Sequence, residues 1–173
     1  MKDRIEIRRG SLLDQHDVEA IVNAANRSMR GGGGIDGAIH RGAGPGLLEE
    51  LIKVAPKGCE AGEVVVTGAH NLPFRYIFHT PGPIWKGGEH GEPETLSACY
   101  RNCILEAEKQ GLASIGFCSI STGVFGYPVR EAAKVALRTL LDIEEGPERI
   151  VFAMFGNEEY AVFRETLRKL GNP

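Results

Sequence analysis

Two polar side chains, Asn26 and Asp36, stand on either side of a run of four glycines, Gly31 to Gly34. Asn26 follows a predicted strand, and Asp36 begins a predicted helix. A carboxylate in such a position can orient or deprotonate a water molecule, which typically accelerates a reaction by about 10²–10⁴-fold. An acidic residue in the first turn of a helix also complements the helix dipole. The sequence alone therefore leaves both capping and chemistry open for Asp36.

A second glycine-bearing loop, Ser121 to Tyr127, follows another predicted strand and leads into a helix that starts near Pro128. In an open α/β sheet, ligands bind at the carboxyl ends of the strands, in the crevice that the following loops form. We expect both glycine loops at this edge, where they direct backbone N–H groups and positive helix ends into one crevice. Such a crevice suits an anion such as a diphosphate.

The glycine run matches neither of two common phosphate-binding motifs. The sequence has no GxxxxGK[ST] stretch, which excludes a P-loop. Gly32, Gly34 and Gly37 satisfy GxGxxG formally, but the region about 20 residues further on, Pro56 to Cys59, contains no strand that ends in an acid. We therefore expect no dinucleotide site of the Rossmann type. An isolated glycine run could also be a loose surface loop, but here an amphipathic helix follows it at once.

The elements that must position these loops alternate between strands and helices, which is typical of a layered α/β architecture. Several strand candidates are apolar throughout, such as Val64 to Val66, as expected for strands that are covered on both faces. The predicted strands are Arg4–Arg8, Ala20–Asn23, Glu63–Thr67, Tyr76–His79, Ser114–Ser119 and Arg149–Phe155.

Apolar residues at helical spacing predict four helical segments. They are Ile35–Val54, interrupted near Gly44-Pro45-Gly46, then Glu94–Gln110, Val129–Leu141 after Pro128, and Tyr160–Leu170, which ends at Gly171. We predict an α/β fold, a three-layer α/β/α sandwich around a central mixed, mostly parallel sheet. A chain of 173 residues is long enough to bury a sizeable core, and we expect one domain over residues 1–173.

Charge and hydropathy limit the classes of partner. The formal net charge is −3, and no cluster of Lys and Arg exceeds the Arg8-Arg9 pair, so we do not expect nucleic-acid binding. No apolar run approaches the ~20 residues of a membrane span, and we expect no signal peptide before the first strand. We expect a cytoplasmic protein that acts as a monomer and does not bind membranes.

The four cysteines show no CxxC spacing. Cys99 and Cys103 lie four residues apart on a predicted helix and could in principle hold a metal. They continue an apolar stripe with Leu96 and Tyr100, however, which favours buried thiols in a reducing compartment. We predict no metal site and no cofactor.

Four segments in this order resemble the macrodomain family, and more narrowly its MacroD-type branch. They are IVNAAN (residues 21–26), GGGGIDGAIH (31–40), HTPGPIW (79–85) and SISTGVFGYP (119–128). The resemblance covers nearly the whole chain. It implies a protein that removes ADP-ribose from acidic side chains and deacetylates O-acetyl-ADP-ribose, with ADP-ribose, its esters and mono-ADP-ribosylated proteins as partners.

The resemblance also implies roles for single residues. Asn26 would hold the distal ribose, and Asp36 would act near its anomeric or acylated carbon, although the ligand's own phosphate could serve as the base. Phe155 would offer its ring to the adenine, with stacking worth about 1–3 kcal/mol. The other residues implied in ADP-ribose binding are Ile21, Asn23, Gly32, Gly33, Gly34, Ile35, Ser121, Thr122, Gly123, Val124 and Phe125; Gly123 and Phe125 would shape the distal ribose pocket and help to place the reactive water.

The chain departs from the family after its first strand. The family usually has a glycine followed by an aspartate that accepts a hydrogen bond from the adenine amino group, whereas this chain has Gly10-Ser11. A hydroxyl can accept such a bond, although a neutral bond contributes only about 0.5–1.5 kcal/mol. Asp14 could take the role if the loop folds back.

The sequence is compatible with three functions. The first is a hydrolase of ADP-ribosyl esters that uses water attack without a metal, and the second is a module that binds ADP-ribose without turnover. The presence of both Asn26 and Asp36 favours the enzyme, because a pure binder has no need of both. A regulator that contacts RNA is the third, and the acidic balance of the chain argues against it.

Overall fold

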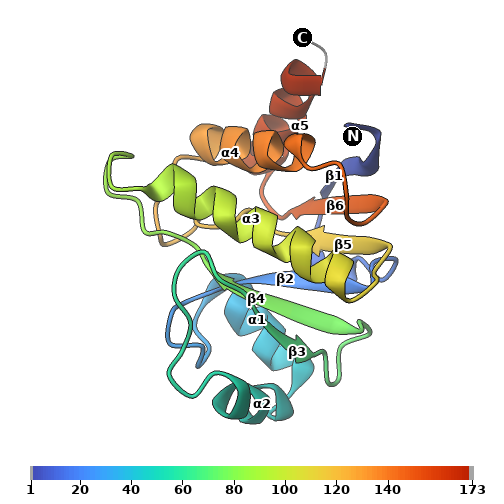
Figure 1. Cartoon of the computed structure of the whole chain (residues 1–173), viewed down its shortest axis with the longest axis vertical. Helices are drawn as coiled ribbons and strands as arrows, with labels where there is room; N and C mark the ends of the chain where they lie inside the picture. The colour runs from blue at the N-terminus through green and yellow to red at the C-terminus, as the bar shows by residue number, and fades with distance from the viewer. Residues whose placement is uncertain (1, 172–173) are drawn as a thin grey trace.

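The structure is a computed structural model, and it describes residues 2–171. Six strands form one mixed sheet in the order β1-β6-β5-β2-β4-β3 (Figure 1). Only β3 runs antiparallel to its neighbour; the other pairs are parallel. Each predicted strand is confirmed within two residues at both ends. The observed bounds are β1 Ile5–Arg9, β2 Ala20–Ala25, β3 Val65–Gly68, β4 Tyr76–Pro81, β5 Ser114–Phe117 and β6 Arg149–Met154.

The predicted helices are also confirmed, including the break in the first segment. It divides into α1 and α2 because Gly44 adopts a left-handed φ of 85° and Pro45 follows it. Two short 3-10 helices, η1 (Lys2–Arg4) and η2 (Leu12–Asp14), flank the first strand. The α-helices are α1 Gly34–Ala43, α2 Gly46–Val54, α3 Glu92–Lys109, α4 Val129–Asp142 and α5 Asn157–Gly171.

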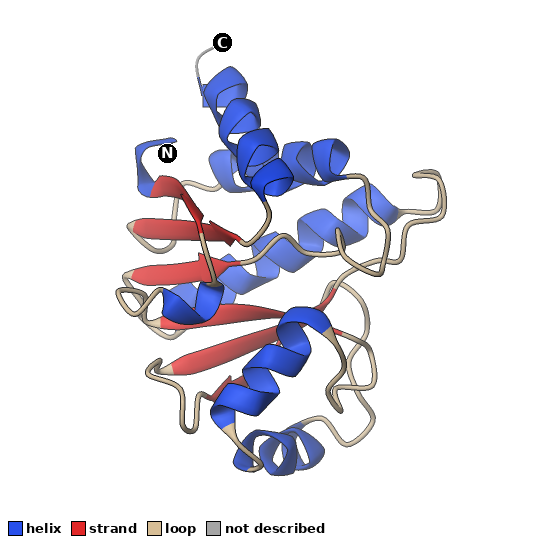
Figure 2. Cartoon of the chain, turned by 180° about the vertical axis from the view of Figure 1, so that it is seen from behind, coloured by secondary structure: helices blue, strands red, loops and turns tan. Residues whose placement is uncertain are grey.

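Helices lie on both faces of the sheet, so the predicted three-layer sandwich is confirmed. Figure 1 shows α3 across one face, and Figure 2 shows α1 across the opposite face. On the α3 face, Phe117 and Phe152 stack with ring centres 5.3 Å apart. Tyr100 from α3 and Phe163 from α5 each place a ring within 6 Å of Phe152. This aromatic cluster joins the helices to the centre of the sheet.

The strand order determines where the loops meet. β1, β6, β5, β2 and β4 all run in the same direction, so the loops that follow them leave from one edge. The loop before α1 follows β2, and the loop before α4 follows β5, which is paired with β2. Both glycine loops therefore lie side by side at the carboxyl ends of the strands, as the sequence predicts.

Candidate functional site

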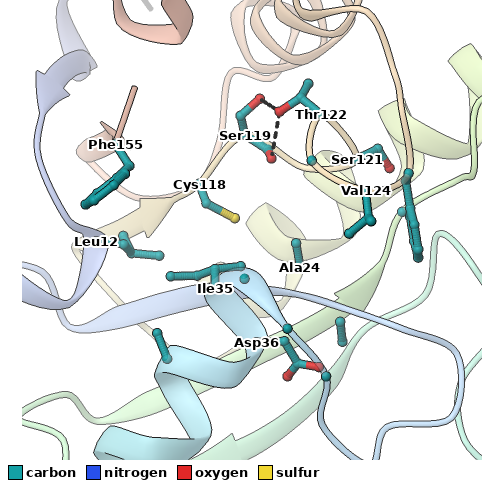
Figure 3. Close-up of a pocket in the computed structure, with 18 of the residues that line it drawn as sticks. Leu12, Ala24, Ile35, Asp36, Cys118, Ser119, Ser121, Thr122, Val124 and Phe155 are labelled. Carbon is teal, nitrogen blue, oxygen red and sulfur yellow. Dashed lines mark hydrogen bonds between the residues drawn. The ribbon is translucent and has the colours of Figure 1, made fainter. Parts of the chain in front are cut away.

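A cavity of about 500 Å³ opens at this edge of the sheet (Figure 3). Its walls come from the segments that follow β1, β2, β4, β5 and β6, so five strands contribute to it. The residues that line it are Gly10, Ser11, Leu12, Ala24, Ala25, Asn26, Gly32, Gly33, Gly34, Ile35, Asp36, Ala38, Gly82, Cys118, Ser119, Ser121, Thr122, Gly123, Val124, Phe125, Ala153, Phe155 and Glu159.

Two groups of residues that line this cavity, 32–36 and 122–125, have backbone N–H groups without hydrogen-bond partners among residues 2–171. The N–H groups of residues 32–36 precede the first hydrogen bond of α1, in which Gly37 N–H donates to Gly33 C=O. The N–H groups of residues 122–125 likewise donate to no group among residues 2–171. Helix N-termini and loops of successive N–H groups bind anions, so two sets of free donors at one cavity indicate a site for an anion.

Close backbone contacts hold the two loops in place. Gly37 lies inside α1, where a methyl group would come within 2.7 Å of Gly32 C=O, so only glycine lets the loop cross the helix here. Gly82, after β4, packs against the Ser121 side chain so tightly that no other residue fits without displacing that loop. Inside the second loop, Thr122 Oγ1 donates to Ser119 Oγ at 2.7 Å (Figure 3).

Asn26 and Asp36 converge at one end of the cavity. A methyl group at Gly32 would lie 3.2 Å from Asn26 Nδ2 and 3.3 Å from Asp36 Oδ2. The space that glycine leaves empty is therefore within hydrogen-bond distance of both side chains. Asn26 Nδ2 donates one hydrogen to Gly31 C=O at 3.0 Å, and its Oδ1 accepts from Ser28 Oγ at 2.6 Å. The second hydrogen of the amide stays available for a ligand.

Asp36 is buried in the first turn of α1, with only 5% of its surface exposed. Its Oδ1 accepts a hydrogen bond from Asn23 Nδ2 at 2.8 Å, and His40 Nε2 lies 3.4 Å from the same oxygen. Its Oδ2 faces the space above Gly32. Asp36 thus presents one oxygen to the protein and the other to the cavity, which suits a group that accepts a proton.

His79 lies behind Asn23 and is completely buried on β4. Its Nδ1 is 3.1 Å from Asn23 Nδ2, and its Nε2 is 2.9 Å from Thr67 Oγ1. Burial, with a smaller effect from the charge of His40, lowers the pKa of His79 from 6.5 to about 3. The ring is therefore neutral at physiological pH, and it has a protein partner at each nitrogen.

Two residues that the resemblance implies in ligand binding, Ile21 and Asn23, do not line the cavity, and their contact with a ligand stays a prediction. The Ile21 side chain is fully buried in the hydrophobic core, because β2 is covered on both faces. Asn23 is also fully buried, and both hydrogens of its amide point to Asp36 and His79. The other predicted residues, from Ser11 to Phe155, do line the cavity; their contact with a ligand stays a prediction.

The opposite end of the cavity carries an unusually exposed aromatic ring. Phe155 follows β6 and is 79% exposed. Figure 3 places Phe155 and Leu12 at the end away from Asp36. A large apolar side chain that remains open to water inside a cavity is typical of a surface that a flat ligand covers.

Ser11 lines the same end but already has a structural role. Its Oγ accepts a hydrogen bond from Leu13 N–H at 3.2 Å and so caps η2. Asp14 is exposed at the end of η2 and does not line the cavity. The expectation that Asp14 could replace a carboxylate at position 11 is therefore wrong, because η2 turns it away.

The structure adds cavity residues that the sequence reasoning did not select. Gly82 could have been found from the sequence, because it belongs to a loop that follows a strand. No sequence pattern indicated Cys118 or Glu159, which is on α5. Burial raises the pKa of the Cys118 thiol to about 12. The thiol is therefore protonated at neutral pH, which argues against a cysteine nucleophile in this cavity.

The second loop is braced from outside by Trp85. Its backbone N–H donates to Phe125 C=O at 2.8 Å, and its ring centre lies 4.6 Å from that of Tyr127. Glu92 at the start of α3 holds the segment that carries Trp85: its carboxylate accepts from the N–H groups of Lys86, Gly88 and His90 at 2.6–2.8 Å. One buried carboxylate thus organises the backbone of this loop.

We expect Glu92→Gln to lower the melting temperature by a few degrees at pH 7. Burial opposes ionisation of Glu92, but the backbone N–H groups outweigh it and lower its pKa from 4.5 to about 2. A lowered pKa stabilises the fold above the unfolded value, and this stabilisation disappears as the pH falls from about 4.5 to about 2. The difference in melting temperature between variant and wild type should therefore shrink over this range in a thermal unfolding series.

Glu94→Gln is the matched control, because Glu94 is in the same first turn of α3 and is exposed. It loses the same charge at the helix N-terminus without the backbone contacts. If both variants have the same melting temperature at pH 7, the hydrogen bonds that Glu92 accepts from Lys86, Gly88 and His90 do not stabilise the protein.

Within residues 2–171, no group of three or more His, Cys, Asp or Glu side chains is arranged to hold a metal ion. Cys99, Cys103 and Cys118 are buried and Cys59 is half-buried, all as free thiols. Over the same residues, no helix combines the length and apolar character that a membrane crossing needs.

The chain is similar to known proteins along nearly its whole length. Residues 22–136 match the model of the Macro domain family. The chain is 45% identical to a Salmonella typhimurium protein named O-acetyl-ADP-ribose deacetylase, with 99% of this chain and 98% of that protein covered. It is 44% identical to a macro domain-containing protein of Caldanaerobacter subterraneus, with 98% and 99% covered.

A solved structure shows the same arrangement of elements. A mutant of the Oceanobacillus iheyensis macrodomain with ADPR superimposes with a TM-score of 0.91 at 40% identity, covering 98% of this chain and 94% of that chain. The family model, the curated relatives and the solved structure all agree with the resemblance that the four sequence segments carry. The chain belongs to the macro domain family.

Proposed function

We propose that this protein binds ADP-ribose and hydrolyses its esters, namely O-acetyl-ADP-ribose and ADP-ribose linked to aspartate or glutamate side chains of proteins. One observation carries the proposal: two sets of residues with unpaired backbone amides line a cavity that has Asn26 and Asp36 at one end and an exposed aromatic ring at the other. A phosphate-bearing ligand with a sugar at one end and a base at the other fits this order.

The amides of residues 32–36 and 122–125 supply donors for the diphosphate. Helix N-termini and loops of successive N–H groups bind anions without a basic side chain. None of the residues that line the cavity is Lys or Arg, so the backbone must supply the stabilisation of the charge. This also agrees with the absence of a basic patch in the sequence.

Asn26 and Asp36 then receive the distal ribose. The free hydrogen of the Asn26 amide binds a ribose hydroxyl, and Asp36 Oδ2 accepts a proton from a water molecule. The water oxygen bonds to the ester carbonyl carbon, the ester C–O bond breaks, and the released ribose oxygen takes up the proton that Asp36 accepted, so the carboxylate is regenerated. The products are ADP-ribose and the free carboxylic acid, and general base catalysis of this kind contributes about 10²–10⁴-fold.

The names of the relatives support the same chemistry. The Salmonella protein is named as a deacetylase of O-acetyl-ADP-ribose, and the Oceanobacillus macrodomain was solved with ADPR. These two proteins are 45% and 40% identical to this chain over nearly its full length. Proteins that carry mono-ADP-ribosyl groups are proposed as the macromolecular partners.

Release of ADP-ribose tests the proposal. The protein is incubated with O-acetyl-ADP-ribose and with a peptide that carries ADP-ribose on glutamate, and the products are separated by chromatography. A peptide that carries ADP-ribose on arginine is the control, because its linkage contains no ester. Release from both esters supports the proposal. Tight binding of ADP-ribose without release from either ester would identify a binding module instead.

Ser11→Asp is expected to bind ADP-ribose about fivefold more tightly, because a bond to a charged acceptor is worth about 1 kcal/mol more than a neutral one. Aspartate can cap η2 with one oxygen and accept from the adenine amino group with the other. Ser11→Asn caps equally well without the charge and is the control. Titration calorimetry with ADP-ribose measures both. Equal affinities of the two variants would show that position 11 does not contact the base.

A further inference from the structure

We propose that His79, supported by Thr67, is a positioning residue for Asp36: it determines which way the Asn23 amide points and thereby holds the Asp36 carboxylate toward the cavity. The proposal rests on the proposed function, since it assigns Asp36 to the reaction. It adds two residues from strands that do not line the cavity. Thr67 lies on β3, His79 on β4 and Asn23 on β2.

The four side chains form one continuous chain of hydrogen bonds. Asp36 Oδ1 is 2.8 Å from Asn23 Nδ2, and the same nitrogen is 3.1 Å from His79 Nδ1. His79 Nε2 is 2.9 Å from Thr67 Oγ1, which donates to Gly68 C=O at 2.9 Å. Asn23 and His79 are opposite each other in the parallel pair β2–β4, so the sheet itself sets this contact.

The group at one end of this chain, the Gly68 carbonyl, determines which atom donates and which accepts in each hydrogen bond. The Gly68 carbonyl only accepts, so the Thr67 hydroxyl donates to it and accepts from His79 Nε2–H. A neutral imidazole with its proton on Nε2 has a bare Nδ1, which accepts from Asn23. The Asn23 amide must therefore turn its NH2 group toward His79 and Asp36. The low pKa of His79 agrees with a neutral ring.

The opposite orientation would weaken the site. If the proton of His79 moved to Nδ1, the Asn23 amide would turn its oxygen to the ring and so toward the Asp36 carboxylate. Two acceptors would then face each other in a buried space, which is unfavourable. The observed orientation leaves Asn23 Oδ1 buried without a hydrogen-bond partner among the described residues. The two bonds from the NH2 group outweigh that loss.

The four hydrogen-bonded residues Asp36, Asn23, His79 and Thr67, here called the relay, are almost completely buried. Asn23, Thr67 and His79 are at most 1% exposed, and Asp36 is 5% exposed. Polar groups in such places cost free energy unless they are fully paired, and apolar residues of similar volume fold as well or better. A chain of polar residues from the β3 edge of the sheet to the cavity is explained by a requirement at the cavity.

Thr67→Val tests the relay at its far end, because valine keeps the volume of threonine and removes the acceptor for His79 Nε2–H. The expected result is a kcat for ester hydrolysis about 3- to 10-fold lower, the size of one lost hydrogen bond, with the Kd for ADP-ribose unchanged within about twofold. Thr80→Val makes the same change at a buried threonine outside the relay, and it should leave kcat unchanged.

His79→Leu and His79→Asn test the acceptor itself. Leucine removes both nitrogens, whereas the Oδ1 of asparagine can occupy a position close to Nδ1 and accept from Asn23. We expect His79→Asn to retain a higher kcat than His79→Leu at equal ADP-ribose affinity. A kcat loss that merely follows lost ADP-ribose binding in these variants would overturn the proposal, since it would indicate a structural role only.

A readout without turnover separates this inference from the proposed function. Long-range ¹H–¹⁵N spectra identify the His79 tautomer, which should be Nε2–H in the wild type and should shift toward Nδ1–H in Thr67→Val. An Nδ1–H or doubly protonated His79 in the wild type overturns the relay, as does an unchanged tautomer with unchanged kcat in Thr67→Val. If the wild type shows the Nε2–H tautomer but hydrolyses neither ester, the proposed function fails while the relay stands.

Discussion

Asp36→Ala is expected to lower kcat for both ester substrates by about 10²–10⁴-fold, because it removes the group that accepts a proton from water. ADP-ribose should still bind, since the amides of residues 32–36 and 122–125 and the Phe155 ring are unchanged. Single-turnover measurement of ADP-ribose release gives the rate, and calorimetry with ADP-ribose gives the affinity.

Asp36→Asn separates the charge from the packing. Its side-chain oxygen can still accept from Asn23 Nδ2, while its NH2 group replaces Oδ2 on the side of the cavity. The fold around α1 should then be preserved, and kcat should fall about as far as in Asp36→Ala. A rate for Asp36→Asn within a few-fold of the wild type would exclude Asp36 as the base and would favour the phosphate of the ligand instead.

Phe155→Ala is expected to weaken ADP-ribose binding by about 5- to 150-fold, the range that corresponds to stacking worth about 1–3 kcal/mol per base. The ring is 79% exposed before the ligand binds, so its removal should leave the melting temperature nearly unchanged. Because the ring lies at the end of the cavity away from Asp36 (Figure 3), kcat at saturating substrate should change little.

Phe155→Tyr keeps an aromatic face and should bind ADP-ribose within about threefold of the wild type. Ile52→Ala removes a half-exposed apolar side chain on α2, outside the cavity, and should not affect binding. If Phe155→Ala binds ADP-ribose as tightly as the wild type, then the base does not stack on this ring, and the assignment of this end of the cavity to adenine is wrong.

Local patterns determined most of the fold. The apolar runs of the strands and the helical spacing of Ala132, Ala136 and Leu140 in α4 depend only on near neighbours, and such periodicities survive in any context that buries one face or both. The break between α1 and α2 was predictable for a similar reason, because Gly44 and Pro45 restrict their own backbone. The predicted cytoplasmic location and monomeric state stay predictions.

Part of the site was also contained in the sequence. Both glycine loops follow predicted strands, and the parallel order of an α/β sheet brings such loops to one edge. Two of the four segments that resemble macrodomains contain Asn26 and Asp36, and the resemblance also implied Phe155; the structure places all three on the cavity. Family membership was thus recognisable before any contact was known.

Tertiary structure decided the roles that depend on partners distant along the chain. Asn23 and His79 are 56 positions apart in the sequence, and Glu92 organises a segment whose Trp85 contacts Phe125. Ser11 and Asp14 are close neighbours in sequence, yet η2 leaves one on the cavity and turns the other to solvent. Residue type and spacing determine what a side chain can do. Which acceptor it meets depends on strand order and on loop contacts, and these arise only when the whole sheet is assembled.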